Sequence, residues 1–452
     1  MVMAWNPPRE RSSTATHVLV LALGCAVVHG TVNRGGFQTG DAATLLVLLA
    51  AAALARTGVH PRVPHPAAPS SASRQGELRV SPAAHAAHPA HAVTAVTAVT
   101  AAILALLGFA AWALVRGDGA RGVPAAALAV GLAAAAWAAT GLDAASRRVL
   151  HAVVIACGLV VAATGWIGVA LHLEPLALVS SGLWRASSTL TYANAAAAFL
   201  VAVLLLAVAV VPATGADRGR RPAPVTVFVL LLGLAATMSR AGLLSLAVGV
   251  LVLLASAHYR DRLRALWPVL PAAAVAFAGL LPALPEMAGP ARLLPASAGL
   301  AAGLAILFLD RRTVVLAAGA VAVAVVIAVP SATFADLAST RLSATSAERG
   351  DLTRVTAAQF LDSPLTGVGP GRLDLVYVDH RGVLVRAEYT HDEYLQVAAE
   401  TGVVGLGLAG TALGALVLAA ARRWRDVTGA PALAIVAAFA LHSAADFLWH
   451  IP

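Results

Sequence analysis

Most of the polar chemistry of this chain lies in one stretch, residues 348–402, which reads ERGDLTRVTAAQFLDSPLTGVGPGRLDLVYVDHRGVLVRAEYTHDEYLQVAAETG. Two apolar runs flank it, Val314–Pro330 before it and Val403–Ala421 after it. Backbone polar groups in hydrocarbon must be satisfied internally, so a long polar segment rich in turn residues cannot cross a membrane. The sequence therefore predicts that this stretch forms a cap at a membrane surface, between two membrane helices.

The rest of the chain has the composition of a membrane scaffold. Of its 452 residues, 59% are hydrophobic and only 12% are charged, and the mean hydropathy is +0.82. A soluble globule of this size needs more polar surface than that. The two cysteines, Cys25 and Cys157, both lie in apolar runs, which leaves neither a disulfide framework nor a thiolate metal site.

Membrane helices can be counted from apolar runs of roughly 17–25 residues, the length that crosses about 30 Å of hydrocarbon. We predict an all-α, polytopic transmembrane helical bundle of about 12–13 spans with a large external helical cap loop. The approximate centres of the candidate spans are Leu23, Leu48, Ala105, Leu132, Leu159, Val203, Val229, Val248, Ala274, Leu304, Val321, Leu413 and Ala437.

Arginine placement gives the predicted orientation, because cytoplasmic connections carry the excess of positive charge. The formal net charge is +9, and every basic residue is an arginine. Alternate connections hold clusters such as Arg147–Arg148 and Arg422–Arg423, and this alternation places the loop 331–393 outside. Because the clusters occupy short connections where topology needs cations, we expect contact with membrane lipids and no binding of nucleic acid.

Four residues of the cap stretch are candidates for chemistry. A helix is predicted over Asp351–Leu361, with Arg349 just before its first turn and Arg354 within it. Clustered guanidinium groups suit a phosphate or pyrophosphate ligand. Anionic lipid headgroups are the alternative ligand. Thr390 is a predicted helix N-cap with Glu393 at capping-box spacing, which places His391 and its neighbour Asp392 in the first turn. An imidazole there can accept a proton from a hydroxyl, or it can simply be a helix-start residue.

Three further candidates lie outside that stretch. Arg240, in the segment TMSRAG, falls at the predicted outer membrane surface, where an arginine either marks a functional site or extends its charge to the interface. Tyr192 and Asn194 precede the sixth predicted span and could line a site or simply begin a helix. No Asp-x-Asp pair occurs in the chain, so we predict neither a metal nor a cofactor.

Four motifs together resemble the O-antigen ligase and O-antigen polymerase superfamily. They are SRAG at Ser239–Gly242, an arginine fourteen residues before SPLTGVGPG, the run THDEYLQVAAETGVVGL from Thr390, and HSAADF at His442–Phe447. The resemblance covers the chain from about Ser187 to its end. It divides the chain into N-terminal transmembrane helices at 1–186 and a ligase-like catalytic region at 187–452. Within the first part, the stretch at about 58–91 is rich in Pro, Ala, Ser and His and is predicted to be a disordered cytoplasmic linker.

The resemblance implies a multi-pass enzyme of the cell membrane that transfers a glycan from polyprenyl pyrophosphate to an acceptor hydroxyl on the extracytoplasmic face. Its substrates would be a polyprenyl-pyrophosphate-linked glycan and a glycan or lipid acceptor, and its inverting glycosyl transfer would need no metal. Arg240 and Arg349 match the family's pyrophosphate-binding arginines, and His391 matches its essential histidine. Tyr192 and Asn194 match a tyrosine–asparagine region loosely.

The sequence departs from the family pattern at three places. His391 is followed by Asp392 where relatives commonly have asparagine, and Thr353 stands where a bulky aromatic is usual. The chain also stops at Ile451–Pro452, where relatives usually continue into another helix. A lipid-glycan or small-solute transporter, which should show inverted repeats and ionisable residues near mid-span, is the alternative function, and a noncatalytic membrane scaffold is a third.

Overall fold

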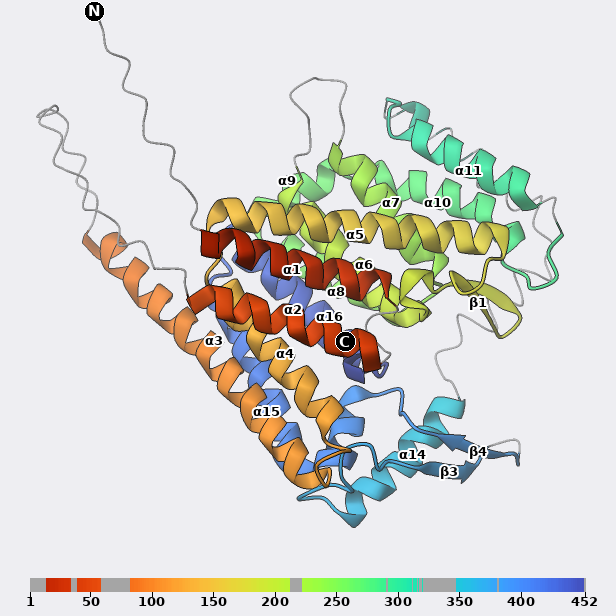
Figure 1. The fold of residues 1–452 in the computed structure, drawn as a ribbon. Coiled ribbons are helices and arrows are strands. Elements are labelled where there is room, and N and C mark those ends of the chain that lie inside the picture. The colour runs from red at the N-terminus through yellow and green to blue at the C-terminus, as the bar shows by residue number, and fades with distance from the viewer. Residues whose placement is uncertain are drawn as a thin grey trace, which may run out of the picture.

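The computed structural model describes residues 14–33, 39–57, 82–211, 222–289, 292–310, 347–379 and 382–450, with isolated positions between 312 and 319. It is an all-α polytopic helical protein, as the sequence predicts, and its described residues also form two short β-hairpins (Figure 1). Every predicted span centre lies inside a helix except Val321, which falls outside the described residues.

Five of the described helices are long and apolar enough to cross a membrane, and α9 (Ala257–Ala265) with α10 (Val269–Leu280) counts as a sixth if this pair, bent by 48°, forms one span. The five are α1 (Thr14–Val32), the segment Thr97–Arg116 of α3 (Pro82–Arg116), α5 (Ala144–Leu171), α6 (Ala193–Val210) and α15 (Glu393–Arg422). Shorter apolar helices are α4 (Val123–Ala139), α7 (Pro222–Ala236), α8 (Arg240–Ala255), α11 (Leu293–Ile306) and α16 (Gly429–Ser443). The remaining long helix is α2 (Thr39–Thr57).

Side-chain caps fix where two of these helices begin. The carboxylate of Asp143 accepts the N–H of Ser146 at 2.8 Å and starts α5, and the hydroxyl of Ser239 accepts the N–H of Gly242 at 3.2 Å and starts α8. Each cap satisfies a backbone donor that the first turn of a helix leaves without a partner. Arg240 is thereby fixed as the first residue of α8.

The bundle is held together by close helix packing around one large apolar core. Its fully buried members include Leu200 and Leu205 of α6 and Leu230 of α7. Small residues allow helices to approach closely, which is the usual way helices associate in a membrane. Gly233 of α7 is one example, because a Cβ at that position would lie 2.5 Å from the Cβ of Ala162 on α5.

The cap, residues 347–392, is built from one helix and one hairpin. Its helix α14 (Ala347–Asp362) packs against α15, and strands β3 (Leu375–Val378) and β4 (Leu384–Ala387) pair antiparallel with Leu375 opposite Ala387. The prediction of a purely helical cap is therefore incomplete. A second hairpin, β1 (Ala177–Ser180) with β2 (Leu183–Ala186), precedes α6 and was also not predicted.

One segment boundary differs from that predicted. Helix α3 begins at Pro82, inside the linker predicted at about 58–91, so this linker is shortened at that end. Residues 58–81 of the linker and residues 331–346 of the external loop lie outside the described part of the chain.

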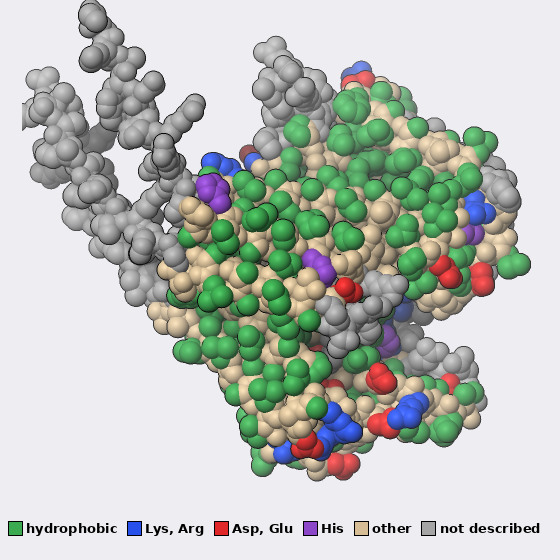
Figure 2. Space-filling view, viewed as in Figure 1, with side chains coloured by type: hydrophobic (Ala, Val, Ile, Leu, Met, Phe, Trp, Pro, Cys, Tyr) green, Lys and Arg blue, Asp and Glu red, His purple; other side chains and the backbone are tan. Residues whose placement is uncertain are grey.

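The bundle has two distinct ends. Arg147 and Arg148 lie in the first turns of α5, whereas the other end of this helix, roughly 42 Å away at 1.5 Å per residue, leads to the β1–β2 hairpin (Figure 1). Figure 2 shows hydrophobic side chains over the broad face of α1, α2 and α5, with charged side chains gathered on the cap and toward the helix ends. That distribution is the one expected of helices that cross a bilayer.

Candidate active site

His391 lies where the cap joins the bundle, directly before α15. The N-cap of α15 is Asp392, whose carboxylate accepts the N–H of Leu395 at 3.1 Å. The prediction of Thr390 as N-cap is therefore wrong, because the extended backbone at Asp392 delays the helix start. Thr390 is buried, and its N–H donates to the side chain of Gln396 at 2.8 Å. His391 consequently stands outside the first turn, with its side chain 31% exposed.

The partner of His391 is Asp446, which lies in the turn after α16. The Nδ1 atom of His391 is 3.1 Å from Oδ1 of Asp446, whose side chain is completely buried. The hydroxyl of Tyr192 donates to the same carboxylate, with both oxygens at 2.7 Å. The carboxylate beside the histidine is thus Asp446, whereas the oxygen of Asp392 caps a helix.

The surroundings of Tyr192 and Asp446 determine the protonation states of these two side chains. Burial raises the pKa of the Tyr192 hydroxyl above its ordinary value, and the nearby charge of Asp446 raises it further. Burial alone would raise the pKa of Asp446, but the hydrogen bond and charge of His391 and the hydrogen bond from Tyr192 outweigh it, and the pKa lies below its usual range. Near neutral pH, Tyr192 therefore remains a donor and Asp446 a carboxylate.

A chain of hydrogen bonds continues from Tyr192 toward the start of α8. The amide nitrogen of Asn194 donates to the Tyr192 hydroxyl at 3.2 Å, and Nη2 of Arg185 donates to the amide oxygen of Asn194 at 3.0 Å. The Nε atom of the same guanidinium donates to the carbonyl of Thr237 at 2.9 Å. Tyr192 is the N-cap of α6 but makes no side-chain capping bond, so its side chain serves this polar cluster instead of the helix start.

Aromatic rings enclose the cluster. The ring of Phe447 stacks on Tyr192 at 5.2 Å and on Tyr389 at 5.1 Å between centroids, and it meets the His391 ring at 5.5 Å. Such packing excludes water from one side of the histidine and restricts its ring orientation.

The three candidate arginines occupy different surroundings. Arg349 lies in the first turn of α14, not before it, and it is close enough to act electrostatically on His442, one turn before Asp446. Arg240 is exposed and lies three residues after Thr237, whose carbonyl accepts the hydrogen bond from Arg185. Arg354 is 77% exposed and pairs at 3.1 Å with Asp351, whose side chain is only 9% exposed.

The glycine-rich turn of the cap docks against a break in α15. The N–H groups of Val368 and Gly369 donate to the carbonyls of Ala399 and Glu400 at 2.9 and 2.8 Å. Gly402 has φ 68° inside α15, and a Cβ there would lie 2.2 Å from the carbonyl oxygen of Leu365. Only glycine fits such a close approach in the left-handed region. The turn therefore positions the cap over the bundle.

Sequence reasoning missed Asp446 and Arg185. The signal for Asp446 was an acid in an otherwise apolar segment, within HSAADF, and the signal for Arg185 was a lone arginine just before the Tyr192 segment. Within the described ranges, no three His, Cys, Asp or Glu side chains gather closely enough to hold a metal ion.

Comparison with known proteins supplies the family. Residues 291–410 match the family described as O-antigen ligase, a region that includes Arg349, Arg354 and His391 but not Arg240, Tyr192 or Asn194. A search of curated proteins finds no match to the chain. The chain thus carries an O-antigen ligase domain, which supports its membership of the O-antigen ligase superfamily.

Proposed function

We propose that this protein transfers a glycan from a polyprenyl pyrophosphate to an acceptor hydroxyl at the extracytoplasmic face of the cell membrane. The O-antigen ligase domain and the apolar helices support a membrane function of the glycan ligase or polymerase type. The observation that carries the proposal is the hydrogen-bonded set of His391, Asp446 and Tyr192 at the junction of the cap and the bundle.

In the proposed reaction, the acceptor oxygen attacks the anomeric carbon as the bond from that carbon to the pyrophosphate oxygen breaks. The acceptor proton passes to Nε2 of His391, and polyprenyl pyrophosphate leaves as an anion. Attack from the face opposite the leaving group inverts the anomeric configuration. Pyrophosphate is a good leaving group, so the protein mainly positions the substrates and neutralises charge, and no metal is required.

Asp446 gives His391 the tautomer that this step needs. A carboxylate accepts the Nδ1–H of the imidazole, which leaves Nε2 as the proton acceptor. As the ring takes up the acceptor proton, the buried negative charge of Asp446 stabilises the imidazolium. The single O–H of Tyr192, which lies 2.7 Å from both oxygens, helps to keep that carboxylate ionised and fixed.

Arg240 and Arg349 are proposed to bind the pyrophosphate, with Arg354 assisting at the surface of the cap. A guanidinium grips phosphate oxygens with two parallel N–H donors and gains most as the leaving group becomes charged. Tyr192 and Asn194, expected to bind substrate, are now proposed to hold Asp446. Asp392 is proposed to fix the start of α15 immediately after the histidine.

A transporter of lipid-linked glycans would move the substrate without breaking the glycosidic bond. Transporter sites lie near the middle of the bilayer, whereas the His391 cluster lies at the end of α6 and α16. Purified protein mixed with polyprenyl-pyrophosphate-linked glycan and an acceptor should release polyprenyl pyrophosphate and give a product of inverted anomeric configuration by NMR. Donor that stays intact after prolonged incubation with the protein would favour transport. A product that retains the anomeric configuration of the donor would exclude the single displacement.

A further inference from the structure

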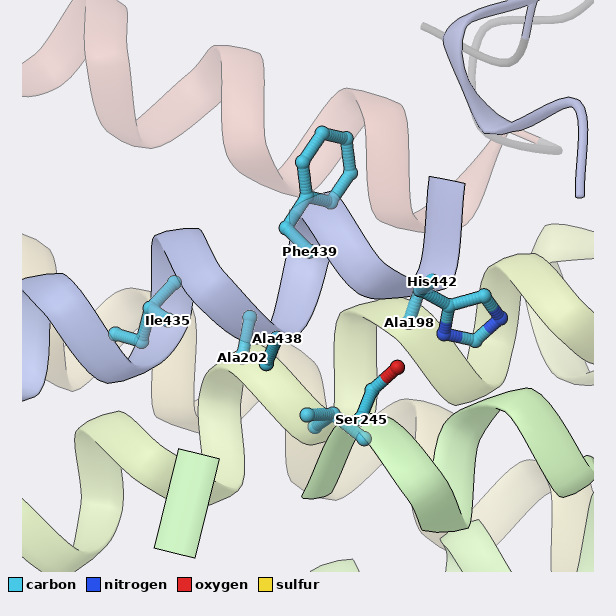
Figure 3. Close-up of a pocket in the computed structure, with 8 residues that line it drawn as sticks. Ala198, Ala202, Ser245, Ile435, Ala438, Phe439 and His442 are labelled. Carbon is cyan, nitrogen blue, oxygen red and sulfur yellow. The ribbon is translucent and has the colours of Figure 1, made fainter. Parts of the chain in front are cut away.

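A small cavity lies inside the bundle between α6, α8 and α16 (Figure 3). Its volume is about 10 Å³, and its walls are apolar apart from two side chains, Ser245 of α8 and His442 of α16. Figure 3 shows the hydroxyl of Ser245 and the ring of His442 facing the same space.

Both side chains are buried and lack hydrogen-bond partners. His442 is 1% exposed and Ser245 is 0% exposed. Within the described chain, neither the two ring nitrogens of His442 nor the hydroxyl of Ser245 has a hydrogen-bond partner. An unsatisfied polar group buried in an apolar environment costs free energy, so two of them facing one cavity indicate a ligand that satisfies both.

We propose that a single water molecule binds in this cavity and bridges Ser245 and His442. The volume is close to the smallest that holds one water. Water can donate to an imidazole nitrogen and exchange a hydrogen bond with a hydroxyl, whereas the apolar walls and the size exclude an ion or a larger ligand. Binding of water would give a partner to the Ser245 hydroxyl and to one ring nitrogen of His442.

The bridge joins two helices that each carry part of the proposed site. Helix α8 begins at Arg240, and α16 runs through His442 into the turn that holds Asp446. A fixed link between Ser245 and His442 would therefore set the spacing between the pyrophosphate-binding arginine and the carboxylate behind His391. This consequence rests on the proposed function, whereas the water site itself does not.

A double-mutant cycle on the purified full-length protein tests the site through its thermal unfolding in detergent. Ser245→Ala and His442→Phe should each lower the Tm, because each leaves one polar group of the bridge unpaired. The double variant removes both groups, so its loss should be clearly smaller than the sum of the two single losses. Ser297→Ala on α11 is the control, because that hydroxyl bonds carbonyls of its own helix.

Additive losses of Tm in the cycle would overturn the bridge, as would a map at high resolution with no density between the two side chains. If His442→Phe does not fold, His442→Leu, which also lacks hydrogen-bonding atoms, replaces it in the same cycle with Ser245→Ala. Transfer activity is measured in parallel: coupling in Tm without any loss of kcat in Ser245→Ala would keep the water site and reject its role in spacing. Absence of transfer by the wild-type protein would reject the proposed function and leave the water site, which the Tm cycle tests by itself.

Discussion

At the scale of single residues, the identity of the acid behind His391 determines the chemistry that the histidine can perform. The sequence suggested Asp392 as the neighbouring carboxylate, but its oxygen caps α15. Asp446 takes that place from a buried turn, where Tyr192 holds it. A fixed, ionised carboxylate therefore contacts His391, while the side chain of the histidine remains 31% exposed.

The pH dependence of stability follows from Asp446. Its pKa is lowered in the folded protein, so the carboxylate stabilises the fold fully at pH values above its unfolded pKa, about 4. This contribution is lost as the pH falls through the lowered folded value. We expect the Tm of the purified protein to fall on acidification below about pH 4, and to fall less steeply in Asp446→Asn.

The matched control for that measurement is Asp426→Asn. This acid is 53% exposed at the other end of α15 and pairs with Arg423 at 3.3 Å, where the charge contributes little. Identical slopes for Asp446→Asn and the wild-type protein would show that Asp446 is not held ionised by its neighbours.

Arg349 is expected to act through the shape of its side chain as well as its charge. Arg349→Lys should lower kcat by ~10²-fold, because an ammonium cannot reproduce a two-pronged grip on pyrophosphate as charge develops. Steady-state rates of polyprenyl pyrophosphate release measure this effect. Arg264→Lys, at a 76% exposed position in α9, is the control and should retain wild-type rates. Unchanged turnover in a folded Arg349→Lys protein would remove Arg349 from the site.

At the scale of elements, the β1–β2 hairpin is tied to the site by one side chain. Arg185 of β2 binds both Asn194 at the start of α6 and the Thr237 carbonyl just before α8. It is thereby linked through Asn194 and Tyr192 to Asp446, and its bond to Thr237 lies three residues before Arg240. We infer that Arg185 is a positioning residue that acts through Asn194 and Tyr192.

Removal of this link should affect turnover more than substrate binding. Arg185→Gln should lower kcat about tenfold or more while KM changes little, because misplacement of catalytic groups acts on the transition state. Arg292→Gln is the matched control, since Arg292 also binds backbone carbonyls, those of Ala170 and Ala288, but has no link to the cluster through them. Equal losses in the two variants would indicate a general loss of stability instead of positioning.

The elements that could be predicted from the sequence are those set by local composition. Apolar runs of roughly 17–25 residues predicted the helices. A polar stretch between two of these runs predicted the cap. The hairpins were missed because strands of four residues, such as Leu375–Val378, carry too little alternation to be distinguished from a loop. The break at Gly402 was also missed, because it depends on the docked turn at Leu365 and not on its own neighbours.

The candidate site was predicted only in part for a similar reason. His391 and Asp446 are 55 positions apart in the chain, and Tyr192 and Asp446 are 254 apart. Pairings over such distances are set by how α6, α15 and α16 pack, which one sequence does not reveal. The motif HSAADF drew attention to the right segment, but the partner of its aspartate came from the structure.

At the scale of the whole molecule, the two ends of the bundle should face opposite sides of the membrane. We expect the cap outside and α9 inside, because the arginines of α9 follow the end of α8 opposite Arg240, and Arg147 and Arg148 lie at the end of α5 opposite the β1–β2 hairpin. A cysteine in place of Leu384, which is 70% exposed on β4, should react with an impermeant thiol reagent in intact cells. Arg264→Cys in α9 should react only after the cells are opened.

Both labelling variants should be made in a background in which Cys25 and Cys157 are replaced by alanine. Labelling of Leu384→Cys only in opened cells would place the cap in the cytoplasm. An acceptor on the extracytoplasmic face could then not reach His391, and the proposed reaction would fail with the topology.

The central claim is that His391, oriented by Asp446, accepts the acceptor's proton during glycan transfer. It is tested most directly by the rate of polyprenyl pyrophosphate release from a polyprenyl-pyrophosphate-linked glycan by the wild-type, His391→Ala and Asp446→Asn proteins, together with Asp426→Asn. We predict a loss of ~10²–10⁴-fold in kcat for both site variants, little change in donor binding, and wild-type rates for Asp426→Asn. Near-normal release by a folded His391→Ala protein would contradict the claim and leave catalysis to positioning and charge neutralisation alone.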